Sequence, residues 1–395
     1  MSFGELAADA IRYARDGFTI TPMPALAAQG FTGLYRDFSE WQAVYAGVRV
    51  GEVLRQEPLA RLIELLSVDG PDAYYHGPVA RDVVETLARY GGLMTTEDLA
   101  AHAGRWEAPM RASYRDVEIA ELPPPTQGVI VLEIMRILDG FDLASMAPAD
   151  REHLIVEAVK IGLRDRDDHV SDPAAMPVAP EAFLAPDWIA ARRDAIDPAR
   201  AQLPEPGHPQ RGGTAYLCAA DGDGLLVSLI QSNFLSFGSG MHVAEWGINL
   251  NNRGSSFSLD PASVNAYAPS KLPMHTLIPG MVLRDGRPEV VFGSMGGDAQ
   301  AQIHAQLLTK IVDDGADLQA TLVAPRWRVE PSDWRLRMEA PFDAGVHRDL
   351  LARGHEIVDV AALDTGMGQA HAIRVGAHGY AIATDPRAEG AAVGL

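Results

Sequence analysis

Gly212-Gly213-Thr214 is the first feature of the sequence whose residue types could do chemistry. The step follows a proline-rich polar stretch and precedes a segment that alternates like a strand, so a hydroxyl stands behind two residues that lack side chains. One interpretation is a turn that leads into a strand. The other is self-cleavage between Gly213 and Thr214, in which the threonine hydroxyl attacks the preceding carbonyl. Hydrolysis would then free an α-amine whose ordinary pKa of about 8 suits a general base.

Gly296-Gly297 is a second glycine pair with chemical potential. Adjacent glycines let backbone N–H groups approach a developing negative charge without interference from side chains, as an oxyanion hole requires. The same pair could instead serve only as the turn before a helix that starts near Asp298. The residues alone leave both interpretations open.

Composition limits what these residues can act on. The chain has 395 residues, 47% apolar and 22% charged, as soluble enzymes do. Its formal charge of -20 repels phosphate backbones and anionic lipid surfaces, so we expect neither nucleic acid nor a membrane as partner. The single cysteine, Cys218, cannot form an internal disulfide, and no cysteine–histidine cluster has zinc-site spacing, so we expect no metal and no other cofactor. Residues 1–15 form an amphipathic helix rather than a signal peptide, which predicts a cytoplasmic protein.

The elements that must position these residues change in character along the chain. Helical periodicity dominates the front half and strand-like alternation dominates the C-terminal part, which predicts a layered α+β fold. Two strands that flank the turn 221–224 should pair as a β-hairpin that begins at Thr214. We expect helices at residues 53–66, 79–90, 129–138, 153–163, 300–314 and 318–323, and strands at 214–220, 225–231, 280–283, 289–292, 370–375 and 380–384.

An exposed linker should join the two parts of the chain. Residues 197–213 combine recurring prolines with polar side chains, which is typical of a linker. It ends the helix-rich part, residues 1–213, and leads into the strand-rich part, residues 214–395.

A collinear series of motifs, spread over essentially the whole chain, resembles the gamma-glutamyltranspeptidase family. Many motifs in one order are far more specific than a single motif. They are Ala14-Arg15-Asp16-Gly17-Phe18, residues 70–77, residues 91–99, Tyr114-Arg115, Pro123-Pro124-Pro125-Thr126-Gln127-Gly128, Phe237-Gly238-Ser239-Gly240, residues 247–252, residues 293–297 and Asp385-Pro386-Arg387.

The resemblance assigns roles to the two candidate features. It implies that the chain is cleaved between Gly213 and Thr214, and that Thr214 is then the catalytic nucleophile. It also implies that Gly296 and Gly297 supply the N–H groups of the oxyanion hole. No metal or organic cofactor is required.

The resemblance also implies a fold and an assembly. The fold is a four-layer αββα sandwich of the N-terminal-nucleophile hydrolase type. Residues 1–213 correspond to a large subunit and residues 214–395 to a small catalytic subunit. The two are expected to interleave in one structural domain and to stay together as a heterodimer of the chain's own cleavage products. Relative to typical members, the chain is expected to be short at its N-terminus.

Several positions depart from the family's pattern near the expected substrate. Asn252 is followed by Arg253, and then by Gly254, Ser255 and Ser256, where typical members carry polar and acidic residues that hold the substrate's α-ammonium. Arg253 would repel an ammonium and attract an anion. It could also be an ordinary solvated loop charge.

His275-Thr276 aligns with the family's serine pair near the substrate carboxylate, and both side chains can donate hydrogen bonds to an anion. His275 could equally be a satisfied core residue. Ser232 and Asn233 could orient Thr214 or could only satisfy local backbone groups. Residues 164–169, rich in charge, are expected to be a solvated cluster at a helix end. The candidate substrate contacts are therefore Asn233, Asn252, Arg253, Ser256, His275 and Thr276.

Three functional hypotheses follow. The first is an N-terminal-threonine acyltransferase or amidohydrolase that moves a γ-glutamyl-like acyl group to water or an amine through an ester on Thr214. The second is an acylase for a glutaryl-type side chain, which lacks the ammonium that Arg253 disfavours. The third is an uncleaved, catalytically silent family member that serves as a binding or scaffold protein.

Overall fold

The computed structural model describes residues 1–204 and 213–394. These residues form two compact units, each made of segments that are distant in the sequence. Unit 1 combines Met1–Trp106 with Leu235–Asn252, and unit 2 combines Glu107–Phe234 with Arg253–Leu395. Most of the expected linker, residues 205–212, lies outside the described residues.

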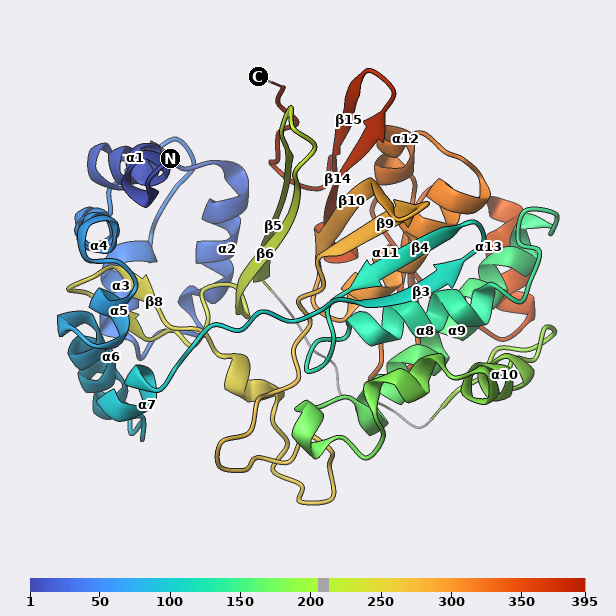
Figure 1. Cartoon of the computed structure of the whole chain (residues 1–395), viewed down its shortest axis with the longest axis horizontal. Coiled ribbons are helices and arrows are strands. Elements are labelled where there is room, and N and C mark those ends of the chain that lie inside the picture. The colour runs from blue at the N-terminus through green and yellow to red at the C-terminus, as the bar shows by residue number, and fades with distance from the viewer. Residues whose placement is uncertain (205–212, 395) are drawn as a thin grey trace. The chain divides into compact units, whose positions relative to one another are not determined.

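Unit 1 is mainly helical (Figure 1). The amphipathic helix at the N-terminus is confirmed, and its first turn is closed by a capping box between Ser2 and Glu5. The helix predicted over 53–66 begins only at Glu57, because Val53–Leu54 pairs with Phe18–Thr19 as a short strand. Its elements are α1 (Phe3–Asp16), β1 (Phe18–Thr19), α2 (Pro22–Thr32), α3 (Ser39–Tyr45), β2 (Val53–Leu54), α4 (Glu57–Asp69), α5 (Asp72–Tyr75), α6 (Pro78–Arg89), α7 (Thr96–Ala100), β7 (His242–Val243) and β8 (Ile248–Asn249).

An aromatic cluster joins the two segments of unit 1. Trp41 is fully buried, and the ring of Phe237 lies 5.2 Å from it and 4.8 Å from the ring of Tyr45, measured between centroids. The Tyr35 hydroxyl donates a 2.7 Å hydrogen bond to the carbonyl of Gly238. The loop that follows β6 is therefore held by the helices of unit 1.

Unit 2 is built on a six-stranded antiparallel sheet with the order β15-β14-β10-β9-β4-β3. The four strands predicted after residue 279 are confirmed. The expectation of a helical front half is wrong for β3 and β4, two short strands that contribute to this sheet. Their pairing depends on β9, far along the chain, so their local pattern gave little indication of it. The strands are β3 (Met110–Tyr114), β4 (Val117–Glu121), β9 (Gly280–Arg284), β10 (Arg287–Met295), β14 (Gln369–Gly376) and β15 (Gly379–Thr384).

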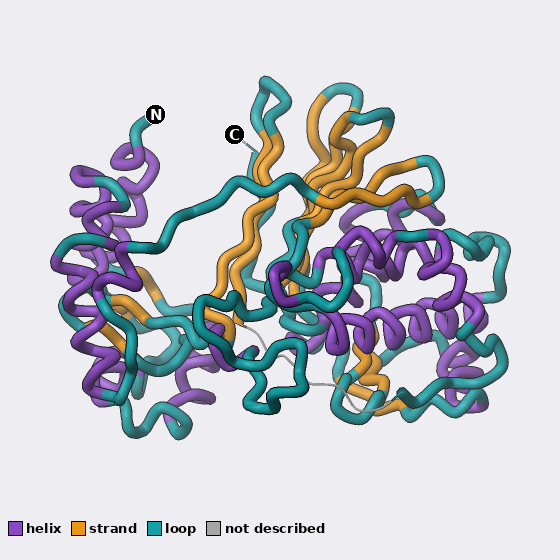
Figure 2. The backbone as a smooth tube through the Cα atoms, turned by 60° about the horizontal axis from the view of Figure 1, so that its bottom comes forward, coloured by secondary structure: helices purple, strands orange, loops and turns teal. Residues whose placement is uncertain are grey.

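The predicted hairpin is confirmed as β5 (Gly213–Ala220) and β6 (Leu226–Phe234). It packs on the face of the sheet opposite the helices. Successive side chains of a strand point to opposite faces. On β10, Phe292 packs in the helical core, whereas Gly293 leaves room for the ring of Tyr216 from the hairpin. In Figure 2 the strands of this unit are orange and its helices, in purple, lie to one side of them.

Helices α8 (Gly128–Leu138) and α11 (Ala299–Leu308) cover the other face, and α9 (Pro148–His169) packs on these two helices. Helix α8 matches the helix predicted over residues 129–138. Helix α9 is longer than the predicted 153–163 because Pro148 is accepted in its first turn and charged residues continue it to His169. Helix α11 stops short of the predicted end, and Thr309–Asp313 continues as a π-helix.

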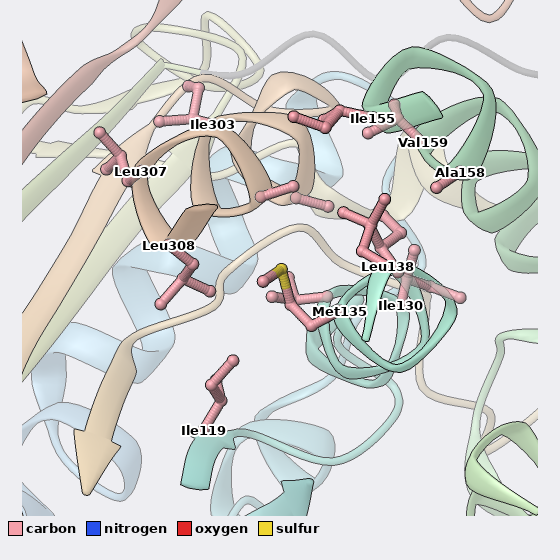
Figure 3. Packing of buried hydrophobic residues seen from close by; sticks show 14 of the residues in the cluster. Ile119, Ile130, Met135, Leu138, Ile155, Ala158, Val159, Ile303, Leu307 and Leu308 are labelled. Atoms are coloured by element: carbon pink, nitrogen blue, oxygen red, sulfur yellow. The ribbon is translucent and has the colours of Figure 1, made fainter. Parts of the chain in front are cut away.

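Facing apolar stripes of these helices form the core of unit 2. Figure 3 shows Ile130 and Met135 of α8 opposite Ile155 of α9 and Ile303 of α11, all of them almost fully buried. Burying a side chain of this kind contributes about 1.5–3 kcal/mol. The helical layer is therefore fixed firmly to the sheet that carries the candidate residues.

A smaller sheet and peripheral helices complete unit 2. The helix predicted at 318–323 is confirmed as α12. Among residues 1–204 and 213–394, no helix is both long and apolar enough to span a bilayer. The remaining elements are α10 (Pro186–Asp194), α12 (Leu318–Val323), β11 (Trp327–Val329), β12 (Leu336–Glu339), α13 (Ala344–Ala352) and β13 (Ile357–Val360).

Candidate active site

Thr214 lies at the start of β5 and its hydroxyl meets the hydroxyl of Ser232 on β6. Thr214 Oγ1 donates a 3.1 Å hydrogen bond to Ser232 Oγ. Ser232 Oγ in turn donates a 2.7 Å hydrogen bond to the carbonyl oxygen of Gly213, and it accepts one of 2.8 Å from the backbone N–H of Phe234. One hydroxyl thus contacts both the side chain of Thr214 and the carbonyl of the peptide bond that precedes it.

A β-bulge explains why Ser232, rather than its neighbour, contacts the threonine. Thr214 pairs with Ser232, but Gly213 pairs with Phe234, so Asn233 is the extra residue of the bulge. No hydrogen bond between described residues joins Asn233 to Thr214. The bulge turns the Ser232 hydroxyl toward the Gly213–Thr214 peptide bond.

Gly296 and Gly297 form the turn between β10 and α11. Their φ angles, +153° and +59°, favour glycine over residues that carry a Cβ. The Gly296 carbonyl accepts a hydrogen bond from Ala299 N at 3.1 Å. Because the C=O and N–H of a trans peptide point in opposite directions, this bond turns the Gly297 N–H away from the helix. Among the described residues, neither glycine N–H donates a hydrogen bond to a protein acceptor.

A network of buried hydrogen bonds and ion pairs holds this turn. Gln127 Nε2 donates to the carbonyl of Gly297 at 3.0 Å and to that of Thr276 at 3.3 Å. Arg166 Nη1 bonds to Gln127 Oε1 at 3.3 Å and to the carboxylate of Asp298, the residue after the turn. Arg166 and Gln127 are fully buried, and Asp298 nearly so.

The expectation that residues 164–169 form a solvated charge cluster is therefore wrong for the inner face of α9. Arg164 and Asp168 do pair near the surface, but Arg166 points into the protein, where it pairs with Asp167 as well as Asp298. Burial alone would lower the pKa of Arg166, but the two carboxylates outweigh it and raise that pKa. The guanidinium stays charged beneath the glycine turn.

Strand directions bring Thr214 and the glycine turn to the same end of the stacked sheets. The Tyr380 hydroxyl donates to the carbonyl of Asp221, so the tips of the β5–β6 and β14–β15 hairpins lie at one end (Figure 1). Thr214 is at the other end of β5 from Asp221. Met295, which pairs with the first residue of β14, ends β10 at that same far end.

Arg253, His275 and Thr276 gather beside the end of β6. The Arg253 guanidinium lies over the ring of Phe234, 4.3 Å from its centroid, and Nη1 donates to Thr276 Oγ1 at 3.4 Å. Burial lowers the pKa of Arg253 to about 10. Burial, and then the charge of Arg253, lower the pKa of His275 to about 4, so its imidazole is neutral at physiological pH. Arg253 is thus not an ordinary solvated charge.

The other predicted substrate contacts are distributed over both units. Asn252 belongs to unit 1, where its side-chain oxygen accepts a 3.0 Å hydrogen bond from the N–H of Leu235. Ser256 belongs to unit 2 and is buried at the end of a short 3-10 helix, Arg253–Ser256. Gln127 and Arg166 were missed as site residues. A glutamine next to the triple proline and an arginine amid acidic residues were the only signals in the sequence.

A second buried polar cluster on α9 anchors the start of the linker. Lys160 Nζ pairs with Glu157 at 2.8 Å and with the carbonyl of Gln202 at 2.9 Å, and His153 bonds to the carbonyl of Asp197 at 2.9 Å. His355 lies between the two, 2.8 Å from His153 and 3.4 Å from Lys160. Donor atoms of His153, Glu157 and His355 are close enough to hold a metal ion. The two histidines bond to each other, whereas the carboxylate of Glu157 accepts hydrogen bonds from Lys160 and from the N–H of Gln202.

Comparisons with known proteins identify the family to which the chain belongs. The family model described as gamma-glutamyltranspeptidase matches residues 1–395. The chain is 38% identical over 400 residues to the oxamate amidohydrolase proenzyme of Klebsiella pneumoniae subsp. pneumoniae, covering 98% of this chain and 75% of that protein. It is 36% identical over 352 residues to the glutathione hydrolase-like YwrD proenzyme of Bacillus subtilis, covering 87% and 67%.

A solved structure shows the same fold. Cephalosporin acylase from Bacillus halodurans superposes with a TM-score of 0.92 at 34% sequence identity, covering 98% of this chain and 73% of that one. The chain therefore belongs to the gamma-glutamyltranspeptidase family of N-terminal-nucleophile hydrolases, whose members are amidohydrolases and transferases. The resemblance drawn from the sequence motifs is confirmed.

Proposed function

We propose that this protein is an amidohydrolase or acyltransferase that cleaves itself between Gly213 and Thr214 and then uses Thr214 as its nucleophile. The observation that carries the proposal is the pair of hydrogen bonds at Ser232. One comes from the Thr214 hydroxyl and the other goes to the Gly213 carbonyl oxygen. A nucleophile and the carbonyl that it must attack therefore share one partner.

Self-cleavage begins when Thr214 Oγ1 attacks the carbonyl carbon of Gly213. Negative charge develops on the Gly213 oxygen, where the Ser232 hydroxyl donates a hydrogen bond. The C–N bond then breaks as the threonine nitrogen takes up the proton that Thr214 Oγ1 lost on attack, and an ester joins Gly213 to Thr214 Oγ1. Water hydrolyses this ester, which leaves a carboxylate on Gly213 and a free α-amine on Thr214.

Turnover repeats this chemistry on a substrate amide. The free α-amine takes the proton from Thr214 Oγ1, and the oxygen attacks the amide carbonyl. The N–H groups of Gly296 and Gly297 stabilise the resulting oxyanion, since they have no protein acceptor among the described residues. The amine leaves with a proton, and water or a second amine releases the acyl group from Thr214.

We further propose that residues 1–213 and 214–395 stay together after cleavage as a heterodimer that forms one four-layer αββα domain. The pairing of Ile119 on β4 with Val282 on β9 supports this, because it joins the two parts inside one sheet. Size-exclusion chromatography of the cleaved protein should give one peak that contains both fragments. Separate elution of the fragments would contradict the heterodimer.

The experiment that tests the nucleophile compares wild type with Thr214→Ala. The variant lacks the attacking oxygen, so it should remain a single chain by intact mass and should hydrolyse no anilide substrate. Thr214→Ser, which keeps a hydroxyl, is the matched control and should still cleave. Cleavage of the alanine variant at the same bond would exclude this mechanism.

A second candidate function is favoured by the surroundings of Arg253. A buried guanidinium next to Thr276 suits a carboxylate and disfavours an ammonium, so the acyl group would be of the glutaryl rather than the γ-glutamyl type. The relatives named oxamate amidohydrolase and cephalosporin acylase support amides other than γ-glutamyl ones. Comparing the hydrolysis of γ-glutamyl and glutaryl anilides separates the two. A single uncleaved chain without hydrolysis of either would support a silent scaffold protein.

A further inference from the structure

The charged group buried beneath the glycine turn has no role in the chemistry described so far. Arg166 is fully buried although it lies in the last turn of α9, and its guanidinium is shared among Asp167, Asp298 and Gln127. A buried ion pair is weak evidence for stability, since apolar residues of similar volume often serve as well. The role of these ion pairs is therefore better sought in the geometry of the glycine turn than in stability.

Two routes of contact lead from Arg166 to the turn. The direct route is the ion pair with Asp298, which follows Gly297 in the chain. The indirect route passes through Gln127, whose oxygen faces Arg166 and whose nitrogen donates to the Gly297 carbonyl. The indirect route ends on the carbonyl of Gly297, and the direct route ends on the side chain of Asp298, the next residue.

We propose that Arg166 is a positioning residue for the oxyanion turn, acting through Asp298 and Gln127. This inference rests on the function proposed above. Gln127 holds the Gly297 carbonyl and Arg166 holds Gln127 and the Asp298 side chain, so together they fix the conformation of the turn that carries the Gly296 and Gly297 N–H groups.

If Arg166 positions the glycine turn, its loss should affect turnover and not self-cleavage. In the precursor, charge develops on the Gly213 oxygen, whose donor is Ser232 on β6. In turnover, charge develops on a substrate oxygen at the glycine turn. Loss of Arg166 should therefore leave cleavage nearly intact and slow the acylation of Thr214.

The test uses the cleaved protein and p-nitrophenyl acetate, an activated ester that needs no knowledge of the natural substrate. The rate of Thr214 acetylation is followed by the mass of the fragment that begins at Thr214 and by release of p-nitrophenolate. We expect Arg166→Met to lower this rate by about 10- to 100-fold, less than the 10²–10³ typical of removing an oxyanion donor outright. Arg166→Lys, which keeps the charge, should restore part of it.

Matched controls distinguish positioning from general damage. Lys160 and Glu157 form an equally buried ion pair on the same helix, so Glu157→Gln should cleave and acetylate like wild type. Gln127→Met keeps the Arg166–Asp298 pair but removes the bonds of Gln127 to Gly297, Thr276 and Arg166. It should slow acetylation even if Arg166→Met does not fold. Variants of Arg166 and Gln127 that cleave and acetylate at the wild-type rate would overturn this inference alone. A wild-type chain that never cleaves would overturn the proposed function instead.

Discussion

The two sides of the candidate site are held in different ways. Thr214 and Ser232 belong to one hairpin, and the contact between them spans 18 positions of a continuous segment. The glycine turn is held by Gln127, which precedes α8, and by Arg166 of α9, both on the other side of the linker in the sequence. The nucleophile is thus positioned by a local element, and the oxyanion turn by the packing of the whole of unit 2. This difference implies that mutations can separate the two reactions of one site.

The largest effect on the hairpin side is expected from Ser232→Ala. Removing the hydroxyl leaves the Gly213 carbonyl without its donor and Thr214 Oγ1 without its partner. We expect self-cleavage to slow by about 10²-fold or more. A time course of intact mass measures this directly.

Ser232→Thr is the control, since it keeps a hydroxyl at the same place and should cleave at a rate close to wild type. If the alanine variant cleaved as fast as wild type, the hydrogen bonds at Ser232 would have no part in the reaction.

On the turn side, Gly297→Ala should reduce turnover more than it reduces stability. A Cβ at φ +59° costs roughly 1–2 kcal/mol, and relief of that strain would rotate the peptide that carries the Gly297 N–H. Urea unfolding and steady-state kinetics on the cleaved protein measure the two effects.

Gly315→Ala is matched in backbone strain, with φ +60° and open space around the added Cβ. It should lose similar stability and keep full turnover. Equal kinetic losses in both variants would show that the turn has no special role.

The prediction with the smallest expected effect on catalysis concerns the linker anchor on α9, which bears on stability alone. Burial, and then the charges of Lys160, His153 and Arg353, lower the pKa of His355 to about 3 from its ordinary 6.5. The unfolded chain therefore binds a proton that the folded chain does not, and stability should decrease as the pH falls from about 6.5 toward about 3. Each pKa unit corresponds to about 1.4 kcal/mol.

His355→Gln should flatten this dependence in urea unfolding measured between pH 7 and pH 4. His378, on the exposed turn between β14 and β15, provides the control, and His378→Gln should retain the wild-type slope. A slope unchanged in His355→Gln would argue against this anchor as an acid-sensitive element.

Whether an element is held by local contacts or by contacts across the core also determines how well the sequence predicts it. The β5–β6 hairpin and α8 are specified by turn residues and apolar spacing that lie close together in the sequence, and these predictions agree with the structure. Strands β3 and β4 were missed because their partner, β9, is distant in the sequence. The helix predicted over 53–66 began too early because pairing between β1 and β2 overrides helical periodicity at Val53–Leu54.

Arg166 illustrates the harder limit. Its acidic neighbours in the sequence are typical of a solvated helix end, and only the docking of α9 against the turn reveals that the guanidinium is buried against Asp298. Asn233 and Ser232 could not be ranked from the sequence either, because a bulge decides which of them pairs with Thr214. Local sequence patterns do not predict contacts that are made across the core.

The most direct test of the account is the intact mass and N-terminal sequence of the purified wild-type chain during incubation at neutral pH. The account predicts two fragments that form with time, the smaller of which begins with Thr214. A single full-length mass that persists would contradict self-cleavage, and a new N-terminus at any other residue would contradict Thr214 as the nucleophile.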